Sequence, residues 1–152
     1  MFFIGIVTNQ KNEAYIKRKL ENKNILFIND KNIANIKNIR FETIVIDSKI
    51  NKNEEFRKIL SNAKYVILNS DIEFDLSLIE NLSLTIITYG FNNKSTFTVS
   101  SITENNIIIC LQRVILKTNG EEIEPEEYRI KNEENIEKYA IIFTEILRKI
   151  YE

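Results

Sequence analysis

Apolar runs and helix-forming segments alternate along the first ninety residues of this 152-residue chain. The β-forming runs lie at residues 2–8, 24–28, 41–47, 64–69 and 84–89. Helix-forming segments lie between them at 11–22 and 52–63, with one or two helical turns at 76–81. Short apolar runs that alternate with helices are typical of a parallel sheet covered by helices. We therefore expect an α/β, Rossmann-like three-layer domain with a mainly parallel sheet.

The pattern changes after residue 90, where no helix-forming segment separates the strand-like runs 97–102 and 107–117. Asn119 and Gly120 follow, and Asn-Gly tolerates the two positive φ angles of a type I′ turn. The return strand should span 121–130 and pair with 107–117 as an antiparallel hairpin. Pro125 cannot donate a ladder hydrogen bond, so this strand should be an edge strand or break there.

The chain closes with a predicted helix at 133–151. Its apolar positions repeat at a spacing of 4-3-4-3 and form one stripe: Ile136, Ala140, Phe143, Leu147 and Ile150. Glu133 and Glu134 at its start, and Arg148 and Lys149 at its end, suit the helix dipole. We expect the helix to pack on the sheet and to bury Ile136, Phe143 and Leu147, with dimerisation as the alternative. Residues 1–152 should then form a single domain.

Composition argues against several kinds of site. The chain has no histidine, one cysteine and three glycines, and its net charge is −1. The common general base and metal ligand is therefore missing, no intrachain disulfide can form, and no basic block predicts nucleic-acid binding. The N-terminal apolar run is too short and uncharged for a signal peptide, and no run has the length of a transmembrane helix. We expect a cytoplasmic protein without membrane contact, metal or cofactor.

Two stretches carry a family resemblance, and the first of them consists of two segments. Residues 65–71, Tyr-Val-Ile-Leu-Asn-Ser-Asp, and residues 86–91, Ile-Ile-Thr-Tyr-Gly-Phe, resemble the central, ATP-binding domain of the bacterial Mur ligase family. In that family an asparagine in the first turn lies near the adenine. The resemblance implies that Asn69 takes this place and Asp71 that of the first aspartate, while Ile72 replaces the second.

The second stretch, residues 5–12, is similar to the phosphate loop of the same family, but in a degenerate form. Thr8, Asn9 and Lys11 match, whereas Gln10 stands in place of a glycine and Asn12 in place of a threonine. Glycine lets a backbone wrap a phosphate, and the hydroxyl binds Mg²⁺, so both replacements weaken the loop. The chain also lacks room for the carbamylated lysine, the metal ligands and the third domain of the family.

These residues have simpler interpretations as well. Asn69, Ser70 and Asp71 favour turns by bonding their own backbone, and Lys11 is typical of a solvated helix start. Our leading hypothesis is a non-catalytic module that binds a protein partner or a copy of itself. The alternative is a weak nucleotide-binding or regulatory domain that uses Thr8, Asn9, Lys11, Asn69 and Asp71. An enzyme with unrecognised chemistry ranks lowest, and we expect neither ATP hydrolysis nor amino-acid ligation.

Overall fold

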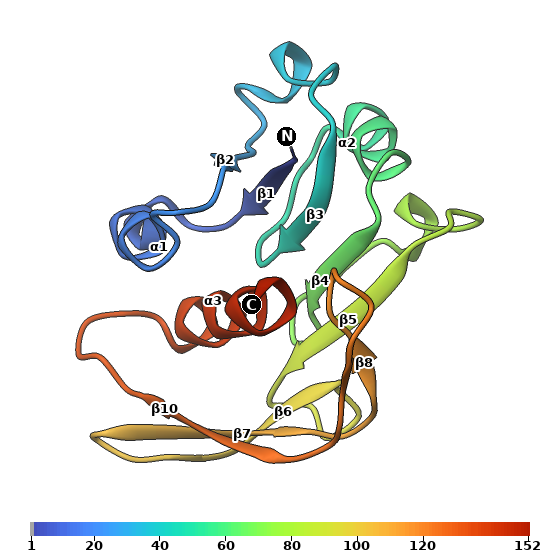
Figure 1. Cartoon of the computed structure of the whole chain (residues 1–152). Helices are drawn as coiled ribbons and strands as arrows, with labels where there is room; N and C mark the ends of the chain where they lie inside the picture. Colours follow the sequence, from blue (N-terminus) through green and yellow to red (C-terminus); the bar gives the residue numbers. More distant parts are fainter. Residues whose placement is uncertain (1) are drawn as a thin grey trace.

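The structure is a computed structural model that describes residues 2–152, which form one eight-stranded sheet, one two-stranded sheet and helices on both sheet faces (Figure 1). The strands are β1 (Phe3–Val7), β2 (Ile25–Phe27), β3 (Phe41–Ile46), β4 (Tyr65–Asn69), β5 (Thr85–Gly90), β6 (Phe97–Ile102), β7 (Asn106–Leu111), β8 (Ile115–Leu116), β9 (Glu122–Ile123) and β10 (Glu127–Lys131). The α-helices are α1 (Glu13–Lys19), α2 (Asn53–Leu60) and α3 (Lys138–Tyr151), and the 3-10 turns are η1 (Gln10–Asn12), η2 (Ile33–Asn35) and η3 (Leu76–Leu78).

The main sheet has the order β10-β7-β6-β5-β4-β3-β1-β2. Strands β1 to β6 form the parallel part of the sheet, and β7 and β10 continue it in antiparallel pairing. Valine and isoleucine dominate the central strands and suit a pleated surface that is buried on both faces. The predicted Rossmann-like α/β class, with its antiparallel extension and closing helix, is confirmed.

Two apolar layers lie on opposite faces of the sheet. One holds Ile4, Val45 and Ile67 of the strands together with α1 and α3. The other holds Ile44 and Val66 together with α2 and the 3-10 turns η2 and η3. Side chains alternate between faces along a strand, so consecutive residues of β3 and β4 pack into the two layers alternately. The arrangement has three layers, as predicted.

Helix α3 lies in the concave face of the curved sheet (Figure 1). Phe143 and Leu147 are 0% and 1% exposed, which confirms their predicted burial, whereas Ile136 is only partly buried. Burial extends beyond the single predicted stripe to Ile141 and Ile142. A helix that is apolar on most of its circumference must be covered on most sides, and the curved sheet and α1 provide that cover.

The start of α3 corrects one prediction. The helix begins at Lys138 and not at residue 133, because Asn135 has a positive φ of 66° that no α-helix contains. Glu133 therefore does not face the helix dipole. Its carboxylate instead pairs with Arg18 and Lys19 of α1 at 2.9 and 3.3 Å.

The predicted hairpin is confirmed, with its break at the proline. β7 pairs with β10 and β8 pairs with β9, both antiparallel, and the segment around Pro125 separates the two ladders. The prediction of a type I′ turn is wrong, because Gly120 has a φ of 90° but Asn119 has no positive φ. Lys117 accepts a hydrogen bond from the Gly120 N–H and donates its own N–H to the Glu121 carbonyl. This is a three-residue loop with glycine at the bulge, which needs only one positive φ.

Candidate functional site

The carboxyl ends of the parallel strands meet at one edge of the sheet. From β1 the chain passes through α1 to β2 on one side, whereas β3 lies on the other side of β1. This reversal creates a switch point between β1 and β3, where doubly wound sheets hold their ligands. Polar residues end or follow the strands there: Thr8 after β1, Asp47 after β3 and Asn69 at the end of β4.

Asp47 is the centre of this edge and is 8% exposed. Its Oδ1 accepts hydrogen bonds from Tyr89 Oη at 2.6 Å and Asn69 Nδ2 at 3.1 Å. Its Oδ2 accepts from Thr8 Oγ1 at 3.0 Å. One carboxylate after β3 thus links β3 to β1, β4 and β5 beyond their ladders.

Burial sets the ionisation of this group. Loss of water raises the pKa of the Asp47 carboxyl above its ordinary value, and the hydrogen bonds from Tyr89, Asn69 and Thr8 oppose that rise. Burial also raises the pKa of the Tyr89 hydroxyl well above its ordinary value, and the neighbouring Asp47 charge adds to the rise. Tyr89 therefore remains a proton donor to Asp47 throughout the physiological range.

A second carboxylate, Asp71, organises the loop after β5. It accepts the backbone N–H groups of Phe91 at 2.7 Å and Asn92 at 3.2 Å, and the Tyr139 hydroxyl at 2.8 Å. Burial and the Asp71 carboxylate raise the pKa of Tyr139 to about 12. Asp71 also joins the first network, because its own N–H donates to Asn69 Oδ1 at 2.9 Å.

Gly90 allows this close approach. A Cβ atom at Gly90 would lie 2.6 Å from Oδ2 of Asp71, and the φ of Gly90 is 151°. Any side chain would displace the Asp71 carboxylate from the two N–H groups that it accepts. The Tyr-Gly-Phe sequence at the end of β5 therefore has a structural role in placing Asp71.

The loop after β1 folds as the 3-10 turn η1, and backbone N–H groups of this turn form hydrogen bonds within the loop. The Asn9 side chain accepts the Lys11 N–H at 3.2 Å, and the Asn9 carbonyl accepts the Asn12 N–H at 3.0 Å. The predicted helix at 11–22 is accordingly shorter, as α1 begins only at Glu13.

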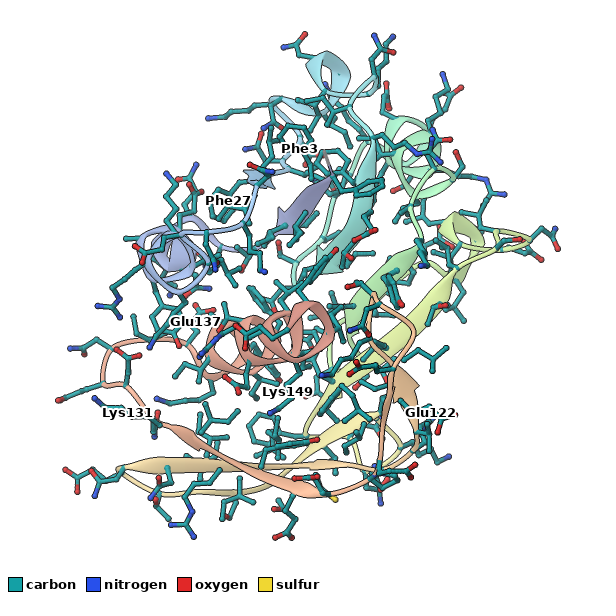
Figure 2. The ribbon with its side chains drawn as sticks, viewed as in Figure 1. Phe3, Phe27, Glu122, Lys131, Glu137 and Lys149 are labelled. Carbon is teal, nitrogen blue, oxygen red and sulfur yellow. The ribbon has the colours of Figure 1, made fainter. Side chains whose placement is uncertain are left out.

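Glu137, the N-cap residue of α3, lies between α1 and α3 (Figure 2) and contacts this loop. Its carboxylate pairs with Lys11 Nζ at 3.1 Å and accepts from Asn12 Nδ2 at 3.0 Å. These contacts, with the Asn12 amide first, lower the pKa of Glu137. Asn12 also donates to Thr8 Oγ1 at 3.3 Å, which links the loop to Asp47.

These residues do not fit a bound triphosphate with Mg²⁺. A phosphate loop directs free N–H groups and a lysine at the anion and holds the metal by a hydroxyl. Here the Lys11 and Asn12 N–H groups are bonded within the loop, the Lys11 ammonium faces a carboxylate, and an amide replaces the hydroxyl. Among residues 2–152, no three histidine, cysteine or acidic side chains gather as a metal site.

All five sequence-predicted residues lie at this edge. Thr8 and Asn69 both bond Asp47, Asp71 follows Asn69, and Asn9 and Lys11 lie in the η1 loop above them. Four further residues of this edge were not predicted from the sequence: Asp47, Tyr89, Glu137 and Tyr139. Only Asp47 had a sequence signal, because it is an acidic residue directly after a buried strand. Parallel strands end at a common edge, where such a residue can join a site.

The fold and this edge define a doubly wound α/β domain whose switch point is filled by its own polar side chains. No family model and no curated protein matches the chain. Among solved structures, the chain is similar to apo D-lactate dehydrogenase from Escherichia coli, at 15% identity and a TM-score of 0.42, over 57% of this chain and 31% of that one. It is also similar to the lysine decarboxylase LdcF of Francisella novicida, at 17% identity and a TM-score of 0.37, over 57% of this chain and 14% of that one. The chain thus spans less than a third of the length of either enzyme.

No helix within residues 2–152 combines the length and apolar character needed to cross a lipid bilayer.

Proposed function

We propose that this chain is a non-catalytic interaction module built on a degenerate, Mur-ligase-like central domain. In this proposal it is a cytoplasmic bacterial protein that acts by binding a protein partner. The scaffold keeps the strand order and the switch point of a nucleotide-binding domain, while the groups that would hold a nucleotide are bonded to one another.

The observation that carries this proposal is the Lys11–Glu137 pair. The only lysine of the degenerate loop has its ammonium 3.1 Å from a carboxylate that comes from the other end of the chain. An anionic phosphate that approached the Lys11 ammonium, whose side chain is 68% exposed, would face the negative charge of Glu137. The buried polar side chains among residues 2–152 all have hydrogen-bond partners within the chain, so none of them requires a ligand to satisfy its hydrogen bonds.

The second candidate is a weak nucleotide-binding or regulatory domain. It is favoured by the convergence of Thr8, Lys11, Asn69 and Asp71 at the switch point, the usual ligand position in such sheets. Phe91 adds to it, because its ring is 50% exposed and lies 5.8 Å from the ring of Tyr139. An exposed aromatic face beside this edge is suitable for stacking a base.

Thermal shift and phosphate release separate the two candidates. With ATP, ADP, a UDP-sugar or NAD, a specific ligand at a hundredfold excess over its Kd would stabilise the fold by about 2.7 kcal/mol. We expect no shift with any of them, and no phosphate release from Mg²⁺-ATP above background.

Two variants make the result interpretable. Lys11→Ala removes the loop cation, and Glu137→Gln removes the competing charge while it keeps an amide that bonds Asn12. A nucleotide shift that is lost in Lys11→Ala and enhanced in Glu137→Gln would establish the second candidate. Phosphate release that vanishes in Lys11→Ala would refute the non-catalytic proposal.

A further inference from the structure

A groove lies at the opposite end of the sheet from the Asp47 network. Its volume is about 480 Å³, and it is bordered by the first residues of β4 and β5 and by the segment 113–120 that contains β8. Tyr65 and Thr85 begin their parallel strands, so this is the amino edge of the sheet. The groove shares no residue with the carboxyl-edge site.

The groove gathers exposed apolar side chains. Ile86, Val114 and Leu116 are 42%, 47% and 46% exposed, and all three line it. The buried residues Tyr65, Ile87 and Ile115 also line it. Single exposed apolar residues are ordinary on a protein surface, whereas several that share one concave site mark a place of interaction.

The β5 side of the groove has an open backbone edge. Thr85 donates to the Lys64 carbonyl, and the Tyr89 carbonyl accepts from Ser70, so the backbone of these two residues faces β4. Alternation turns the N–H and C=O of Ile86 to the opposite side. There β6 pairs only from Tyr89 onward, so within residues 2–152 no strand pairs with β5 at Ile86.

The same alternation opens the β8 side. Lys117 donates to the Glu121 carbonyl, and Ile115 lies opposite Ile123, so the intervening Leu116 turns its backbone groups away from β9. The Leu116 carbonyl accepts a hydrogen bond of 3.5 Å from the Tyr65 hydroxyl at the groove, and a carbonyl oxygen has a second lone pair for another donor. Two strand edges therefore border the groove, and an extended chain between them would find hydrogen-bond partners on β5 and on β8.

The charge of the groove selects the partner. Lys64, Arg113 and Lys117 line it, and no carboxylate does. Glu122, which Figure 2 labels, lies instead on β9, the partner strand of β8. Glu124 and Glu126 follow it along the hairpin, and Lys117 pairs with Glu121 there. A segment with carboxylates is attracted by the groove and repelled by the neighbouring hairpin surface, since opposite charges steer an encounter and like charges suppress it.

We propose that this groove binds an extended segment of a partner protein in which apolar residues alternate with aspartate or glutamate. The segment adds a short strand beside Ile86, places its apolar side chains on Val114 and Leu116, and directs its carboxylates to Lys64 and Arg113. Strand addition to an open edge obtains affinity from the backbone and specificity from alternate side chains. The assignment rests on the proposed role as an interaction module, for which it supplies the partner chemistry.

The test is a selection from a displayed library of random peptides about ten residues long, enough to cover one strand. It is run in parallel on the wild-type protein, on Leu116→Glu and on Leu76→Glu. Leu76 is a leucine 69% exposed outside the groove, so its variant is the matched control. We expect wild type and Leu76→Glu to enrich peptides in which valine or isoleucine alternates with acidic residues, and Leu116→Glu to enrich none of them.

One enriched peptide is then synthesised and its Kd is measured by fluorescence anisotropy. We expect Leu116→Glu to weaken binding about tenfold or more, equivalent to about 1.4 kcal/mol, and Leu76→Glu to change it less than about twofold. Charge reversal by Lys64→Glu and raised salt should both weaken binding. The Ile86 amide should become protected from hydrogen exchange only when the peptide is present, and circular dichroism checks that each variant is folded.

Three outcomes would overturn this assignment. They are no enrichment over Leu116→Glu, enrichment of basic peptides, or a concentration-dependent dimer that Leu116→Glu abolishes, which would make a second copy the occupant. None of these outcomes tests the proposed function, because that proposal is tested by nucleotide binding and phosphate release with the Lys11 and Glu137 variants.

Discussion

Replacing Asp47 with alanine would remove the carboxylate that links β3 to β1, β4 and β5 at the switch point. Thr8, Asn69 and Tyr89 would each lose the acceptor of a hydrogen bond of 2.6 to 3.1 Å. Asn69 and Tyr89 are 1% and 0% exposed, so water cannot readily replace the lost acceptor, whereas the half-buried Thr8 can find a water molecule.

The magnitude follows from the two buried donors. An unsatisfied buried donor costs about 1–3 kcal/mol, which gives about 2–6 kcal/mol for the pair. Removal of a buried carboxylate relieves some desolvation and offsets part of this cost. We expect Asp47→Ala to lower the free energy of unfolding by about 2–4 kcal/mol.

Asp47→Asn is the matched control. The asparagine keeps one side-chain oxygen, which accepts the hydrogen bonds from Asn69 and Tyr89. Its NH₂ group lies beside Thr8 Oγ1, which can accept a hydrogen bond from it. It also removes the charge. Burial raises the folded-state pKa of Asp47 above 3.8, so the protonated form is the one that folding favours. The stability that this group contributes is fully present below pH 3.8 and is lost as the pH rises through the folded-state pKa. Wild type should therefore lose stability relative to Asp47→Asn over that interval.

The assay is urea unfolding of wild type and both variants between about pH 3.5 and 8, followed by circular dichroism and fitted with a common m-value. A loss below about 1 kcal/mol in Asp47→Ala would refute the network as a stabilising device. A wild type that gains stability over Asp47→Asn as the pH rises would refute the sign of the pKa shift.

Two further changes test the core and the β5 loop. Phe143→Ala should cost about 3–5 kcal/mol in urea unfolding because the ring is fully buried, with the exposed Arg148→Ala as control; a loss below about 1 kcal/mol would place the ring outside the core. Gly90→Ala should cost about 1–3 kcal/mol, because its Cβ would meet Asp71 at 2.6 Å at a positive φ, and it should also speed hydrogen exchange of the Phe91 amide; unchanged exchange at Phe91 would contradict the placement of Asp71.

The sequence by itself determined most of the secondary structure. Strands β1 to β6 lie where β-branched runs predict them, and α2 buries Phe56, Ile59 and Leu60 at helical spacing. The break at Pro125 follows from a missing N–H, and the hairpin from an Asn-Gly pair between strand-forming runs. These signals depend on neighbours within a few positions, so they are readable without a fold.

The tertiary structure decided the rest. Tyr139 reaches Asp71 across 68 positions and Glu137 reaches Asn12 across 125, and neither pairing has a local signature. The start of α3 also depends on the fold, since its N-cap residue Glu137 bonds Lys11 and Asn12 of the loop after β1. Sheet curvature makes α3 buried over most of its surface, where its sequence predicted one stripe. Strand order and curvature arise from packing over the whole chain, and they bring together residues whose spacing along the sequence carries no period.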